Sequence, residues 1–157
     1  MTATKSPISA TREIRHGRAI DSVVALEAQH GHETALSRLR AFMIQYLNPL
    51  RSNAPQEIRA AFEVAEQLRN HSRLTPDLER ARDLCWAYLS ARRITYDFQN
   101  KDNCAARAVL AVLQREPPQL YLGEACYWFL QYADEVNDQS NSIDALVEKI
   151  LRSSSEA

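Results

Sequence analysis

The sequence predicts an all-α fold, a compact antiparallel bundle or two-layer array of six to seven amphipathic helices. The 157-residue chain has only three glycines, at positions 17, 31 and 123. No stretch alternates apolar and polar residues over the length of a strand, and no Asn-Gly or Asp-Gly pair marks a hairpin. Apolar residues instead recur at helical spacing nearly everywhere after residue 19.

The chain divides into a single helical domain with a tail at each end. Residues 1–18 are rich in Ser, Thr and Arg, poor in acid, and lack the apolar stretch of a secretory signal. We therefore expect residues 1–18 to form a flexible basic N-terminal tail. Residues 19–152 are expected to form the domain, and residues 153–157 a disordered tail.

The first helical pattern covers residues 19–47. His30-Gly31-His32 interrupts it, which predicts either a kink or two joined helices. Further helices are expected over residues 55–70, 76–95, 103–115 and 120–138, and after Ser142. Pro55 and Pro76 suit first helical turns, and Asp102 is the expected cap of the helix over 103–115.

The stretch over residues 120–138 is the most apolar and aromatic in the chain. One stripe at helical spacing predicts a core face: Leu122, Ala125, Cys126, Phe129, Ala133 and Val136. A second, aromatic stripe with an acidic rim is the best candidate for a partner-binding surface, since interfaces are enriched in Tyr and Trp. Its residues are Tyr121, Glu124, Trp128, Tyr132, Glu135 and Asp138. The alternative is that these aromatic side chains pack against two neighbouring helices.

Charge is unevenly distributed along the sequence. Residues 1–115 contain 17 Lys and Arg against 12 Asp and Glu, whereas residues 116–157 contain 2 against 8. This asymmetry indicates one acidic and one basic surface.

Residues that could carry chemistry form no recognisable site. His30 and His32 are two residues apart, whereas a helical metal site needs a spacing of four. His16 and His71 are interpreted as surface or capping residues, so no metal is expected. The adjacent pair Asp134-Glu135 is interpreted as part of a solvated face.

The three cysteines show no disulfide pattern. Cys85, Cys104 and Cys126 have apolar neighbours, which predicts buried free thiols in a reducing compartment. No phosphate-binding loop is present, and no apolar run approaches the roughly 18 residues of a membrane span. We therefore expect a cytoplasmic, non-enzymatic protein without a cofactor or membrane contact.

A second candidate interface contains Arg82, Trp86 and Arg93, which group together on one helix and would suit nucleic acid. Glu79 and Asp83 dilute this patch, and the net charge is −1. Both observations argue against nucleic-acid binding.

The order of the helices and their alanine-rich texture resemble those of the small helical immunity proteins of bacterial polymorphic toxin systems. The resemblance covers residues 55–137 and is carried by AAFEVAEQLRN, LERARDLCWAYLSARR, NCAARAVLAVLQ and GEACYWFLQYADEV. It implies a cytoplasmic, non-enzymatic protein that binds and blocks a cognate protein toxin. The acidic end of the chain fits a basic nuclease toxin, because complementary charge speeds association.

Overall fold

The computed structural model describes residues 7–68, 76–91, 100–113 and 121–152. All regular structure in these ranges is helical, which confirms the predicted fold class. The α-helices are α1 (Pro7–His30), α2 (His32–Leu47), α3 (Arg59–Gln67), α4 (Pro76–Ala91), α5 (Lys101–Leu113), α6 (Leu122–Val136) and α7 (Ile143–Leu146). Short 3₁₀ turns cover Asn48–Asn53, Gln56–Ile58 and Ser140–Ser142, and a π-helical turn covers Val147–Leu151.

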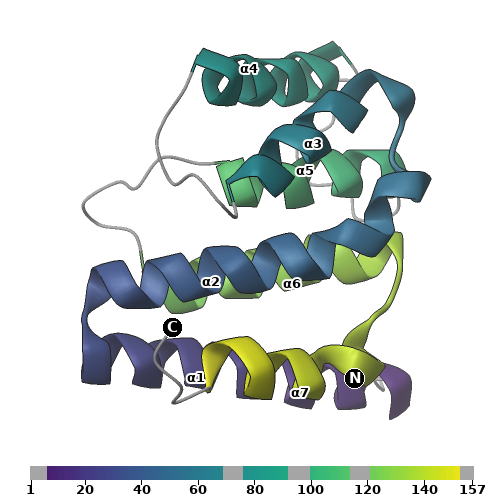
Figure 1. Ribbon diagram of the computed structural model, residues 1–157. Helices are drawn as coiled ribbons and strands as arrows, with labels where there is room; N and C mark the ends of the chain where they lie inside the picture. The colour runs from purple at the N-terminus through teal and green to yellow at the C-terminus, as the bar shows by residue number, and fades with distance from the viewer. Residues whose placement is uncertain (1–6, 69–75, 92–99, 114–120, 153–157) are drawn as a thin grey trace.

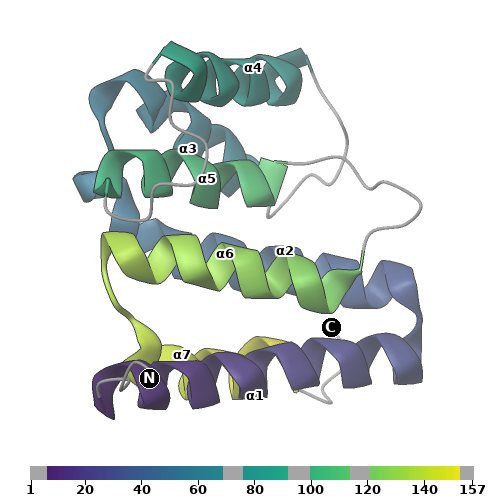
Figure 2. The ribbon, with the colours of Figure 1, turned by 180° about the vertical axis from the view of Figure 1, so that it is seen from behind.

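The helices stack in tiers (Figure 1). Helices α1 and α7 lie at one end, α2 and α6 form the next tier, α3 and α5 follow, and α4 is outermost. Seen from behind, α6 runs between α1 and α5 with α2 beyond it (Figure 2). Helices of the inner tiers pack against neighbours on more than one side, and α5 is buried over nearly its whole length.

Helix α6 is the centre of the packing. Its most extensive contacts are with α5 and α1, and it also contacts α2. The predicted core stripe is confirmed, with Ala125 partly buried and the other five residues buried; Leu130 also joins the core. The tight α5–α6 contact follows from small buried residues on α5, namely Cys104, Ala105, Ala106 and Ala108.

The N-terminal segment differs from the expectation of a flexible tail through residue 18. Residues 7–18 form the first three turns of α1, continuous with the helix that was expected to begin at residue 19. Their inward face is polar, with Arg12, Arg15 and His16, so it lacks the apolar periodicity that marks a helix. Partners for these residues lie far away in the sequence, as shown below.

Two helix boundaries show how local sequence sets the chain path. Gly31 ends α1 and precedes α2 with a φ of 93°, a conformation that favours glycine, so two joined helices are confirmed over a kink. At α5 the cap is Asn100 and not Asp102. The Asn100 side-chain oxygen accepts a hydrogen bond from the Asn103 backbone N–H at 3.1 Å.

Other boundaries shift by a few residues. The helix expected over 55–70 begins as a 3₁₀ turn and becomes α3 only at Arg59. The expected last helix begins as the short α7 and continues as a π turn to Leu151. The tail over 153–157 lies outside the described residues.

Candidate functional site

Three aromatic side chains are exposed at the N-terminal half of α6, one of them from Tyr121, which directly precedes the helix. Tyr121 is 74% exposed, Tyr127 41% and Trp128 40%, and the exposed carboxylate of Glu124 lies among them in sequence. We call these four residues the α6 aromatic surface. Large aromatic side chains exposed together are uncommon on a monomer unless they bind something.

Tyr132, the third member of the predicted aromatic stripe, belongs to the core. It is only 8% exposed and belongs to the buried core, although it lies one turn after the exposed Trp128. Its ring centroid lies 6.2 Å from that of Trp128, and the Trp128 centroid lies 5.0 Å from that of Tyr127. The packing alternative therefore holds for Tyr132, whereas Tyr121 and Trp128 face outward.

A groove runs between α1 and the N-terminal end of α6, beside this surface. Its volume is about 480 Å³, and most of its exposed lining is apolar. The lining residues are Ile20, Val24, Glu27, Tyr121, Leu122, Gly123, Glu124 and Tyr127. Sequence reasoning missed Ile20, Val24, Glu27 and Tyr127. A signal for Tyr127 was present in Gly123. A glycine inside a helix can indicate that another helix comes close, and Tyr127 lies one turn after Gly123 on the same face of α6.

The C-terminal part of the predicted acidic rim is already paired within the protein. Arg12 donates to the Asp138 carboxylate at 2.8 Å, and its guanidinium lies 3.6 Å from Glu135. Burial acts to raise the pKa of Asp138, but hydrogen bonds from Ser140 and Arg12 outweigh it and hold the pKa below its usual value. Glu135 and Asp138 are thus paired with α1, while their side chains remain 40% and 33% exposed.

The same pairing extends along α1 toward the acidic end of the chain. Arg18 lies 3.0 Å from Asp144, and Arg15 donates to the Ser140 carbonyl at 3.0 Å. The basic N-terminal segment and the acidic C-terminal segment therefore fold against each other. This corrects the interpretation of the charge asymmetry as two separate surfaces.

Beneath this contact lies a buried polar network that joins three helices. His16 on α1 donates from Nε2 to Oδ2 of Asp134 on α6 at 2.5 Å, and the Tyr46 hydroxyl on α2 donates to Oδ1 at 2.5 Å. The Gln139 backbone N–H also donates to Oδ1, at 3.0 Å. Burial, and next the charge of Asp134, raise the pKa of Tyr46 far above its usual value.

The network overturns two interpretations from the sequence. His16 is 2% exposed and is neither a surface nor a capping residue, and Asp134 is 2% exposed and is not part of a solvated face. Glu135, the next residue, points toward solvent and Arg12, since neighbours on a helix diverge by about 100°. Because the three side chains are enclosed, a substrate has no access to them, and their role is to join the helices.

The cysteines are buried free thiols, as predicted. Burial raises the pKa of Cys85 and of Cys126 to about 12. A thiol with so high a pKa is a poor nucleophile at neutral pH.

The alternative interface on α4 is partly built. Trp86 is 44% exposed and lies 5.2 Å below the guanidinium of Arg107, while Arg82 lies 3.9 Å from Glu79. Arg93 lies outside the described residues. Arg107 and Arg82 thus contact Trp86 and Glu79 of the protein itself, an arrangement that does not favour phosphate binding.

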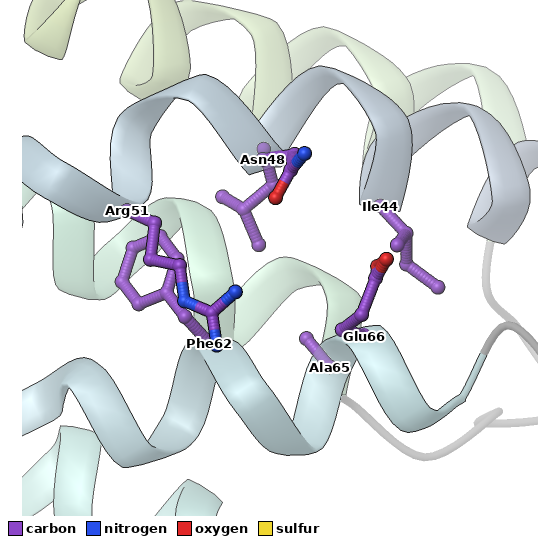
Figure 3. Close-up of a pocket in the computed structure, with 7 residues that line it drawn as sticks. Ile44, Asn48, Arg51, Phe62, Ala65 and Glu66 are labelled. Atoms are coloured by element: carbon purple, nitrogen blue, oxygen red, sulfur yellow. The ribbon is translucent and has the colours of Figure 1, made fainter.

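A second recess lies between the end of α2 and α3 (Figure 3). Arg51 reaches beside Phe62, and Glu66 and Ala65 face Ile44 and Asn48. Its volume of about 10 Å³ is near the minimum for a single water molecule, so it is too small for a larger ligand.

Three further observations concern the residues that the structure describes. No three His, Cys, Asp or Glu side chains among them gather closely enough to hold a metal ion. None of the helices in these ranges combines the length and apolar character needed to cross a bilayer. Compared with known proteins, the chain matches no family model, no curated protein and no solved structure.

Proposed function

We propose that this protein is a non-enzymatic protein-binding module, and that it acts as an immunity protein that binds and neutralises a cognate bacterial toxin. The observation that carries the proposal is the α6 aromatic surface, three exposed aromatic side chains beside an apolar groove. Tyr and Trp are the residues most often found as binding hot spots. The resemblance to helical immunity proteins supplies the class of partner.

The pairing of the α6 carboxylates indicates which part of α6 is proposed to contact the toxin. Glu135 and Asp138 are held by Arg12, whereas Glu124 has no ion-pair partner among the described residues. The proposed interface is therefore the N-terminal half of α6 with the adjoining part of α1. Its binding residues are Tyr121, Glu124 and Trp128, and Tyr132 supports Trp128 from below.

The test is co-expression with a candidate toxin domain taken from the gene adjacent to that of this protein. Wild type is expected to restore growth, and Tyr121→Ala combined with Trp128→Ala to abolish the rescue. Loss of two hot-spot aromatics is expected to weaken toxin binding by a factor of at least about 30, measured by isothermal titration calorimetry. Tyr132 is left unchanged because its burial would confuse a folding defect with a binding defect.

Trp86→Ala is the matched control. Trp86 is 44% exposed, close to the 40% of Trp128, and α4 lies at the opposite end of the stack from α1 (Figure 1). This variant is expected to bind and to rescue like wild type. Full binding by the folded double variant, or loss of binding in Trp86→Ala alone, would contradict the proposed surface.

A further inference from the structure

Gly123 lines the groove between α1 and α6, at a point where side chains of α1 come close to the backbone of α6. A Cβ atom at this position would lie 3.0 Å from Cγ2 of Val24 and 3.5 Å from Cγ2 of Ile20. Val24 is 52% exposed and Tyr127 41%, so the apolar lining is open to solvent. An open apolar groove next to exposed aromatic side chains gains free energy when another apolar group covers it.

Two carboxylates border this apolar lining, Glu27 from α1 and Glu124 from α6. Glu27 Oε2 lies 2.6 Å from Nδ1 of His32, and the Glu27 side chain is 35% exposed. Glu124 has no ion-pair partner in the described part of the chain. The groove therefore offers an apolar floor with negative charge at its border.

We propose that this groove receives a segment of the protein partner that carries one large apolar side chain flanked by Lys or Arg. The proposal rests on the proposed function and names the chemistry of the partner at the same surface. A cation next to the apolar side chain would meet Glu124 and Glu27 at the border of the groove. A second copy of this chain fits less well, because a symmetric contact would bring the carboxylates of two grooves together.

Two indole compounds that differ in charge test this chemistry without the partner. Tryptamine carries an ammonium group, and indole-3-propionate carries a carboxylate on a chain of similar length. Each is titrated into the full-length protein labelled with ¹⁵N, and amide shifts are followed by NMR. Tryptamine is expected to shift the amides of Val24, Gly123 and Glu124 and to bind about twofold to fivefold more tightly than indole-3-propionate, since an exposed ion pair contributes a factor of up to about five.

Substitutions link the shifts to the groove. Val24→Lys is expected to abolish tryptamine binding, and Glu124→Gln to reduce the preference for tryptamine by about twofold to fivefold. Ile14→Lys is the matched control: Ile14 is 59% exposed on the same helix but does not line the groove. This control should bind tryptamine like wild type, and amide spectra show whether each variant is folded.

The outcomes separate this inference from the proposed function. Equal affinity for the two compounds, no saturable shifts at the groove, or toxin neutralisation unaffected by Val24→Lys would overturn the inference. A dimer in sedimentation that Val24→Lys dissociates would overturn it in favour of a second copy. Failure of the proposed function would appear differently, as wild-type protein that neither binds the toxin nor restores growth.

Discussion

Replacing Asp134 by alanine tests whether the buried network joins α1, α2 and α6. The Asp134 side chain is 0% exposed and accepts hydrogen bonds from His16, Tyr46 and the Gln139 backbone. His16 is 2% exposed and Tyr46 0%, so neither can turn to water when the carboxylate is removed. The variant therefore leaves buried polar groups without a partner.

The magnitude follows from the number of groups left behind. An unsatisfied buried polar group costs about 1–3 kcal/mol, and removal of the carboxylate leaves such groups on both His16 and Tyr46. We expect Asp134→Ala to lower the free energy of unfolding by roughly 3–5 kcal/mol, and the midpoint temperature by about 6–20 °C for a chain of this length. Tyr46→Phe removes one hydroxyl, and the Asp134 carboxylate keeps its hydrogen bonds from His16 and the Gln139 backbone. We therefore expect this variant to lower the free energy of unfolding by about 1–2 kcal/mol.

The assay is urea unfolding followed by far-UV circular dichroism, with linear extrapolation to zero denaturant. Glu135→Ala is the matched control, since it removes the adjacent carboxylate on the partly exposed side of α6. Its contact with Arg12 at 3.6 Å is expected to contribute less than about 1 kcal/mol. A cost for Asp134→Ala of less than about 1 kcal/mol, or one equal to that of Glu135→Ala, would refute the reasoning.

Three other predictions concern the same helices. The pKa of Tyr46 is raised in the folded protein, so the contribution of its hydroxyl to the free energy of unfolding is complete below about pH 10 and falls by about 1.4 kcal/mol per pH unit above it. The stability difference between wild type and Tyr46→Phe should therefore shrink in urea unfolding at alkaline pH. A difference that stays constant with pH would contradict this. Deletion of residues 1–18 is expected to cost more than about 3 kcal/mol in the same assay, because it removes the partners of the buried and paired carboxylates, whereas a neutral deletion would indicate a flexible tail after all. Gly31→Ala should destabilise the protein by about 1–3 kcal/mol because φ is positive at this position. Gly17→Ala should stabilise it by about 0.5–1 kcal/mol, because Gly17 lies inside α1 with open space around it. A higher midpoint temperature for Gly31→Ala than for Gly17→Ala would contradict the backbone conformations at these two glycines.

The fold class could be predicted because it depends on local pattern. Few glycines, helical spacing of apolar residues and the proline starts all act within a few residues of the chain. The core stripe of α6 was predicted for the same reason, since Phe129 and its neighbours follow one period along one helix.

The N-terminal turns could not be predicted, because what they bury is polar. Arg12 and His16 pair with Asp138 and Asp134, which lie 126 and 118 residues further along the chain. A hydrophobic pattern cannot detect a helix whose inner face is charged and whose partners are that distant. The charge asymmetry contained the signal, but it was interpreted as surface charge and not as a contact between the two ends.

The candidate site was predicted in part. Tyr121, Glu124 and Trp128 are exposed at the N-terminal half of α6, which is one of the two alternatives that the sequence left open. The apolar groove beside them depends on where α1 crosses α6, and this crossing is fixed by tertiary packing at Gly123. Helical spacing within one segment therefore grouped the aromatic residues, but it showed neither which of them are exposed nor which helix borders them.

Hydrogen–deuterium exchange with and without the toxin domain tests the central claim most directly. The claim is that a protein partner covers the N-terminal half of α6 and the adjoining part of α1. Bound toxin is expected to slow amide exchange in peptides that cover residues 20–27 and 121–128, with no change in α4. Protection confined to α4, or to the end of α6 near Asp138, would contradict the account.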